Sequence, residues 1–153
     1  MADRLLPEEL LQQLKSKFPS LEVVEGQVIM IPAEDLFSFV KELKENPVYN
    51  FNYLTNVTAV DYTDRFEVIY NLVSVPDGLL LTVKVKLEDK ENASVPSLCP
   101  LYAGANWQER EVYDLMGVNF TGYPGHPTRI LLDDGFRGHP LRKDFQWEGG
   151  REP

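Results

Sequence analysis

The sequence predicts an α+β protein: a two-layer sandwich of helices on a mixed, largely antiparallel sheet, followed by an extended C-terminal tail. Three observations support this prediction. Two early stretches carry apolar residues at helical spacing, and three later runs are rich in Val, Thr, Ile and Tyr. The last third of the chain is interrupted repeatedly by Gly and Pro. A long helix or strand does not tolerate such interruptions, so this part should be a turning tail.

The first half predicts two amphipathic helices with a β-hairpin between them. Residues 7–18 place Leu10, Leu11, Leu14 and Phe18 on one helical stripe, with Pro7 in the first turn. Residues 21–24 and 27–31 are β-rich and flank a Glu25-Gly26 turn. A second helix is predicted from Pro32 to about Glu45, ended by Asn46-Pro47.

The middle of the chain predicts an antiparallel meander of three strands. The runs cover residues 53–60, 66–75 and 79–87, separated by polar turn residues. In the third run, alternate residues are apolar: Leu79, Leu81, Val83, Val85 and Leu87. Since alternate strand residues point to opposite faces, one face of the sheet should be buried under the helices.

One short turn and one last helix precede the tail. Residues 94–97 are expected to cap a short helical turn that carries Leu98 and Leu101. Asn106, with Glu109 three residues later, predicts a capping box at the start of the last helix. Gly117 should end this helix. Arg110 and Asp114, four residues apart, are expected to pair on its surface.

Length and charge restrict the class of protein. The 153 residues suit an α+β domain over residues 1–120 and a partner-binding tail over residues 121–153. A net charge of −9 argues against a nucleic-acid partner, which would need a basic face. Cys99 is alone, so neither a disulfide framework nor a cysteine metal site is expected. No apolar run is long enough to span a bilayer, which predicts a cytoplasmic protein without membrane insertion.

The tail differs from the rest of the chain in charge and in apolar content. Residues 125–145 contain four basic and three acidic residues, although the chain as a whole is strongly acidic. The same stretch carries six large apolar side chains: Ile130, Leu131, Leu132, Phe136, Leu141 and Phe145. Aromatic residues mixed with arginine are enriched at protein interfaces, so the tail is expected to be covered by another polypeptide.

Two enzymatic interpretations are weaker. His126 and His139, with Asp133 and Asp134 between them, offer metal-ligand atoms, but their spacing matches no compact motif. The alternative is that each imidazole donates a hydrogen bond to a carbonyl and fixes a turn. A hydrolase would need a nucleophile beside a base, and neither Cys99 nor any serine has a nucleophile-elbow context.

The run from Glu109 to Phe145 resembles the signature of the 30-kDa subunit of proton-pumping NADH:quinone oxidoreductase, or respiratory complex I. The matching stretches are Glu109-Arg110-Glu-Val-Tyr-Asp-Leu-Met-Gly117, His126-Pro127, Arg129-Ile-Leu and Gly135-Phe-Arg-Gly-His-Pro-Leu-Arg-Lys-Asp-Phe145. The residues at the family's motif positions are Glu109, Arg110, Asp114, Arg129, Phe136, His139, Pro140, Arg142, Lys143, Asp144 and Phe145.

This resemblance implies a subunit of the peripheral arm at the cytoplasmic face of the membrane. Such a subunit has no catalytic residues and no cofactor of its own, because the iron–sulfur clusters and the quinone belong to its neighbours. The resemblance also implies two partners: the large subunit that helps form the quinone site, and the subunit with the terminal iron–sulfur cluster. The motif residues are expected to lie at this partner interface.

The sequence departs from the family pattern in one place. Gly122-Tyr123-Pro124-Gly125 intrudes before His126, and Thr128 stands where the family has a basic residue. Either Tyr123 or His126 takes the position of the usual histidine. Related modules also occur in membrane-bound hydrogenases and in complexes that use ferredoxin or a deazaflavin, so the electron donor stays open.

Overall fold

The computed structural model describes residues 6–24, 28–123, 130–132 and 136–146. The elements in chain order are α1 (Glu8–Lys17), β1 (Glu22–Val24), β2 (Val28–Met30), α2 (Ala33–Glu45), β3 (Tyr53–Asp61), β4 (Phe66–Ser74), β5 (Leu79–Leu87), β6 (Ser94–Pro96), α3 (Ala105–Met116) and β7 (Asn119–Thr121). Their order and type match the predicted helices, hairpin, meander and last helix. The Glu25-Gly26 turn lies outside the described residues.

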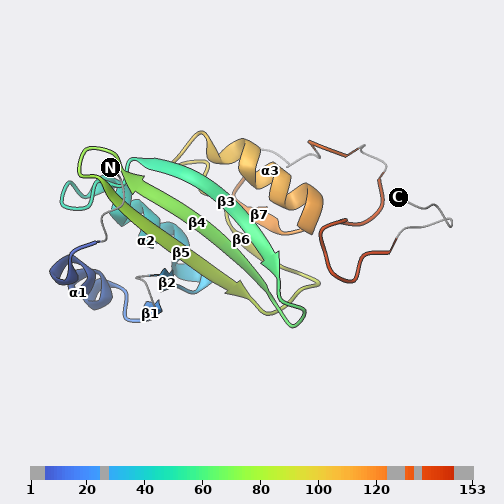
Figure 1. Cartoon of the computed structure of the whole chain (residues 1–153), viewed down its shortest axis with the longest axis horizontal. Coiled ribbons are helices and arrows are strands. Elements are labelled where there is room, and N and C mark those ends of the chain that lie inside the picture. Colours follow the sequence, from blue (N-terminus) through green and yellow to red (C-terminus); the bar gives the residue numbers. More distant parts are fainter. Residues whose placement is uncertain (1–5, 25–27, 124–129, 133–135, 147–153) are drawn as a thin grey trace.

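The main sheet has five strands in the order β1-β2-β5-β4-β3. Its neighbours pair antiparallel except β2 and β5, which run parallel. The sheet is therefore mixed and largely antiparallel, as predicted. Figure 1 shows α2 lying against one face of this sheet and α3 beside its β3 edge, with the tail beyond α3.

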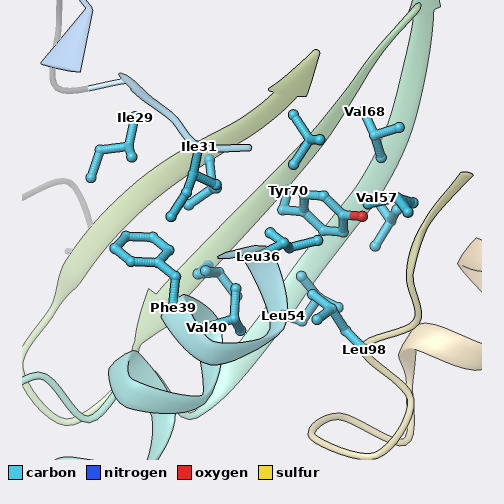
Figure 2. Close-up of a cluster of buried hydrophobic side chains, with 14 of the residues drawn as sticks. Ile29, Ile31, Leu36, Phe39, Val40, Leu54, Val57, Val68, Tyr70 and Leu98 are labelled. Carbon is cyan, nitrogen blue, oxygen red and sulfur yellow. The ribbon is translucent and has the colours of Figure 1, made fainter. Parts of the chain in front are cut away.

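The core lies between α2 and the sheet. Leu36, Phe39, Val40 and Leu43 of α2 are buried. The apolar residues of β5 face them, and the alternation along this strand is as predicted. Figure 2 shows the side chains of α2 and of strands β2 to β4 meeting in this layer. Burying each such side chain is worth about 1.5–3 kcal/mol, so this layer provides much of the stability that supports the tail.

Two local predictions about the region before the tail are wrong. Residues 94–96 form β6, which pairs parallel with β7, and not the start of a helical turn. The buried Val95 explains the strand, because its side chain enters the core. The turn itself begins at Leu98, whose carbonyl accepts the N–H groups of Leu101 and Tyr102.

The predicted capping box of α3 is also absent. The helix begins at Ala105 and its N-cap is Gly104, without a side-chain cap. The N–H groups of Ala105 and Asn106 instead bond to carbonyls of the preceding turn, so no carboxylate is needed there. Glu109 is thereby available for a different role. Gly117 ends the helix in the left-handed conformation, as predicted.

The predicted boundary between residues 120 and 121 falls inside β7. The division into a domain and a tail stays a prediction.

In the described part of the chain, no helix combines the length and the apolar character needed to cross a bilayer.

Candidate partner interface

Asp114 connects α3 to the tail from inside the protein. Its side chain has no exposed surface, and one carboxylate oxygen, Oδ2, accepts the N–H groups of residues 130, 131 and 132. The N–O distances are 3.0, 2.7 and 3.0 Å. Hydrogen bonds to an ionised acceptor are stronger than neutral ones, so three of them fix this piece of the tail firmly. The expectation that Asp114 lies at the surface, paired with Arg110, is therefore wrong about its location.

Beyond residue 136, the tail donates hydrogen bonds to the carbonyl groups at the C-terminal end of α3. The last four carbonyl groups of a helix have no partner within the helix. Here all four accept hydrogen bonds: Tyr113 O from Gly117 N, Asp114 O from His139 Nδ1, Leu115 O from Leu141 N and Met116 O from Arg142 Nε, at 2.9, 3.0, 3.0 and 2.6 Å. Three of these donors belong to the tail. The Arg142 cation also interacts favourably with the negative end of the helix dipole.

His139 donates one of these hydrogen bonds, and the bond defines the tautomer of its imidazole ring. Because a carbonyl oxygen only accepts, Nδ1 carries the proton in its bond to Asp114 O. The ring also lies edge-on to Tyr113, with ring centroids 6.3 Å apart. For His139, the interpretation that the imidazole donates to a carbonyl is confirmed. His126 lies outside the described residues.

Gly117 makes the close approach of the tail possible. Its φ is +78°, and a Cβ atom there would lie 2.6 Å from His139 Cδ2 and 2.7 Å from Arg142 Nη2. Any other residue at this position would displace both side chains. The guanidinium of Arg142 also donates a hydrogen bond from Nη2 to the carbonyl of Lys90, at 3.3 Å, and its central carbon lies over the Phe66 ring, 4.9 Å from the ring centroid. Arg142 is half-buried and is therefore not part of a solvated charge run.

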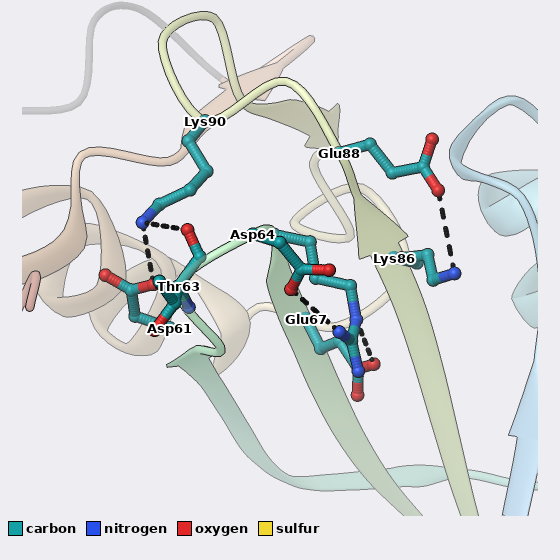
Figure 3. A network of polar contacts seen from close by, with 8 residues as sticks. Asp61, Thr63, Asp64, Glu67, Lys86, Glu88 and Lys90 are labelled. Carbon is teal, nitrogen blue, oxygen red and sulfur yellow. Dashed lines mark hydrogen bonds and ion pairs between the residues drawn. The ribbon is translucent and has the colours of Figure 1, made fainter.

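A second buried carboxylate, Asp61 at the end of β3, holds the tail from the sheet. It accepts the backbone N–H of Lys143 at 2.9 Å, and it forms an ion pair with Lys90 at 2.8 Å (Figure 3). Burial favours its protonated form, but the hydrogen bonds from Lys90, Lys143 and Thr63 outweigh burial and lower the pKa of Asp61. This contribution to stability is present at neutral pH and is lost as the pH falls through the lowered pKa.

The tail also packs on itself. The rings of Phe136 and Phe145 stack with centroids 6.0 Å apart and an interplanar angle of 16°. Gly138 lies between them in sequence with φ of +88°, and a Cβ atom there would be 2.9 Å from Phe145. Residues 136–145 therefore form a closed turn on the end of α3, while the side chains of Lys143 and Asp144 remain exposed.

Glu109 is the third buried carboxylate, one turn earlier on α3. It accepts the Ser97 hydroxyl at 2.7 Å, the Leu98 N–H at 2.8 Å and, more weakly, the Cys99 thiol at 3.4 Å. These contacts fix α3 to the segment after β6. Burial raises the pKa of Glu109, against the lowering effect of these hydrogen bonds. Burial likewise raises the pKa of Cys99 to about 11, so its thiol stays protonated at neutral pH.

Glu109→Gln should change the pH dependence of stability. A carboxyl group whose pKa is raised on folding contributes stability that is fully present below its unfolded pKa, about 4.3, and is lost as the pH rises through its folded pKa. The free energy of unfolding of the wild type minus that of Glu109→Gln should therefore decrease as the pH rises. Urea unfolding of both chains at several pH values measures this difference. Glu111→Gln makes the same substitution at an exposed position of α3 and is the control, which should leave the free energy of unfolding nearly unchanged. A pH-independent difference for Glu109→Gln would contradict the raised pKa of Glu109.

A family model described as the respiratory-chain NADH dehydrogenase 30 Kd subunit matches residues 29–151. The chain is also 49% identical over 152 residues to an NADH-quinone oxidoreductase subunit of Moorella thermoacetica, covering 94% of this chain and 99% of the relative. The chain belongs to the family of the 30-kDa subunit of NADH:quinone oxidoreductase.

Other relatives of this 30-kDa subunit family differ in length. An NADH-quinone oxidoreductase subunit of Geotalea uraniireducens is 41% identical over 162 residues, covering 100% of this chain and 96% of the relative. The 30.4 kDa mitochondrial subunit of Neurospora crassa is 50% identical over 120 residues, which cover 76% of this chain but 40% of the relative.

Two solved structures share the fold of the 30-kDa subunit family. A chain of the membrane-bound sulfane sulfur reductase, an archaeal respiratory membrane complex, superposes with a TM-score of 0.77 at 31% identity, covering 91% of this chain and 85% of that one. A trypsin-resistant fragment of Nqo5 superposes with a TM-score of 0.60 at 32% identity, covering 76% of this chain and 96% of the fragment.

The motif residues of the 30-kDa subunit family separate into internal and surface groups. Glu109 and Asp114 are buried and act within the chain. Most of the others gather at the end of α3: Phe136, His139, Pro140, Arg142 and Phe145 are half-buried, and Lys143 and Asp144 are exposed. Arg110 lies earlier on α3, its guanidinium 4.9 Å from the Trp107 ring. Arg129 lies outside the described residues.

Three large apolar side chains of α3 and the tail are exposed. Trp107 of α3 is 61% exposed, and Leu131 and Leu141 of the tail are each 59% exposed. Sequence reasoning singled out none of Trp107, Asp61 and Lys90. The Trp107 signal was available, since a large aromatic residue next to motif residues on one helix is typical of an interface.

The metal-site interpretation gains no support in the described part of the chain. His126, Asp133 and Asp134 lie outside it. Among the described residues, no group of three or more His, Cys, Asp or Glu side chains is placed to hold a metal ion.

Proposed function

We propose that this chain is a non-catalytic part of the peripheral arm of proton-pumping NADH:quinone oxidoreductase. It docks through its tail, residues 121–153, on the large quinone-site subunit and beside the subunit with the terminal iron–sulfur cluster. It supports electron transfer to quinone by holding these neighbours together, and it carries no cofactor itself. The complex attaches it to the cytoplasmic face of the membrane.

One observation carries this proposal: the tail is fixed to α3 and still leaves large apolar side chains uncovered. Buried Asp114 and Asp61 hold the backbone at residues 130–132 and at Lys143, so the described parts of the tail have a defined position before any partner binds. Leu131, Leu141 and Trp107 nevertheless stay exposed. Exposed aromatic and aliphatic residues near arginines are typical of interface hot spots. A pre-shaped surface also loses less conformational entropy on binding.

Replacing both exposed leucines, by Leu131→Ser with Leu141→Ser, should weaken docking at least tenfold. Burial of a leucine is worth about 1.5–3 kcal/mol, and these two side chains are still mostly exposed in the free chain. Most of this free energy is therefore gained only when the partner covers them. Because both side chains are exposed, the thermal midpoint of the free chain should hardly change. Binding to source-organism membranes depleted of this subunit measures the effect.

The matched control is Val48→Ser with Val75→Ser, two exposed valines outside the tail, 51% and 61% exposed. This variant should bind like the wild type. Equal binding by the leucine variant would remove the basis for docking through the tail.

A second candidate is the equivalent subunit of a membrane complex with another electron donor, such as a membrane-bound hydrogenase or a ferredoxin-dependent complex. The similarity to a chain of the sulfane sulfur reductase favours it. Pulling the native complex from the membrane through this chain separates the two candidates. NADH:quinone activity in the isolated complex supports the first, and its absence together with activity on another donor supports the second.

A further inference from the structure

The turn at the end of α3 borders an open surface pocket of about 290 Å3. Arg137, His139 and Arg142 line it, together with Asp144 and Phe145. Among the described residues, two guanidinium groups, an imidazole and one carboxylate line this space. In a chain of net charge −9, the described lining has more basic than acidic side chains.

Arg142 makes this pocket unusual. It is half-buried, and its hydrogen bonds reach only neutral carbonyls, Met116 O and Lys90 O. No carboxylate among the described residues lies within ion-pair distance of its guanidinium. By contrast, Arg65 lies 2.9 Å from Glu67, and Lys90 lies 2.8 Å from Asp61. The two carbonyls and the helix dipole stabilise this cation but carry no full negative charge, so an added anion would still be bound favourably here.

The form of the guanidinium indicates which anion fits. Nε and one Nη donate to carbonyls, and the guanidinium carbon lies over the Phe66 ring, 4.9 Å from its centroid. The remaining N–H groups form a planar donor edge that suits a carboxylate. Leu141, 59% exposed, lies next to Arg142 in sequence and favours a polypeptide over a water-filled ion site. We infer that the pocket at Arg142 receives an aspartate or glutamate side chain of the partner subunit.

This inference rests on the proposed docking and adds the chemistry of the partner. Two substitutions test it by charge. Arg137→Gln removes one pocket cation and leaves the hydrogen bonds of His139, Leu141 and Arg142 to the α3 carbonyls in place, and Arg142→Gln removes the other cation. Each should weaken binding to the depleted membranes about tenfold and make binding less sensitive to salt. Lys143→Gln, the same change of charge outside the pocket, is the control and should have a smaller effect.

Cross-linking identifies the anion directly. In the assembled complex carrying Arg142→Lys and Lys143→Gln, a zero-length carbodiimide reagent should join position 142 to a partner Asp or Glu, found by mass spectrometry. Three results overturn the inference: no cross-link at 142 in an assembled complex, an unchanged salt dependence for both arginine variants, or an effect that disappears when anionic lipid is removed. If the arginine variants and the leucine variant all bind normally, the proposed docking through the tail fails as well. If the leucine variant binds weakly and the arginine variants bind normally, only the carboxylate pocket fails.

Discussion

Gly117→Ala is expected to release the tail from α3. The backbone at this position has φ of +78°, which costs an alanine about 1 kcal/mol. The added Cβ would lie within 2.8 Å of three side-chain atoms of His139 and Arg142, so both must move. Their bonds to the last carbonyls of the helix are then lost, and the total loss in unfolding free energy should be about 2–3 kcal/mol. Trypsin cleavage at Arg137 and Arg142 should become at least tenfold faster.

Gly122→Ala is the matched control for this experiment. Gly122 has nearly the same φ, +76°, but a Cβ atom there meets nothing within 4 Å. Its cost should be limited to the backbone strain of about 1 kcal/mol, with little change in cleavage at Arg137 and Arg142. If both glycine variants behaved alike, the contact of the tail with Gly117 would not be what holds it.

Asp114→Ala is expected to free residues 130–132. The substitution leaves three backbone N–H groups without their acceptor, and hydrogen bonds to a charged group contribute about 1.5–3 kcal/mol each. The freed N–H groups can form hydrogen bonds with water instead, so the free energy of unfolding should fall by about 3–4 kcal/mol, which is less than the sum of the three bonds. Hydrogen exchange should show the amides of residues 130–132 losing protection, while those of β4 keep theirs.

Asp144→Ala controls for the loss of a carboxylate in the same region. Asp144 is exposed on the tail itself, so its removal should change neither stability nor exchange by a measurable amount. Asp114→Asn should have a stability and an amide protection between those of the wild type and Asp114→Ala, because it keeps an acceptor oxygen but loses the charge. Full protection of residues 130–132 in Asp114→Ala would show that other contacts fix the tail.

The parts of this fold that sequence reasoning predicted are those with local signals. The alternation in β5 and the helical stripe in α2 each lie within one element, and Gly117 is a helix stop in its own right. The tail was predicted from its Gly, Pro and apolar residues together. These patterns depend on neighbours in sequence, so they can be read without knowing what packs against them.

The misplaced residues are those whose partners are distant in sequence. Asp114 was expected on the surface because it lies four residues after Arg110, the spacing of an exposed ion pair on a helix. Its three donors are the N–H groups of residues 130–132, and the residue pattern within α3 could not predict this contact with the tail. Glu109 was assigned to a capping box and instead binds residues 97–99. Val95 joined a strand whose partner, β7, lies beyond a whole helix. Long-range contacts of this kind decide the position of each buried carboxylate.

The parallel pairing of β2 with β5 also sets an order of assembly. Val28 pairs with Thr82, and α2, β3 and β4 lie between them in the chain. During synthesis on the ribosome, β1 and β2 emerge early, but the strand they must join does not yet exist. The three-strand meander closes through short turns and needs no such delay. The N-terminal hairpin must therefore wait, with its edge unpaired, until β5 has emerged; that interval is when a nascent chain is most exposed to wrong strand pairing.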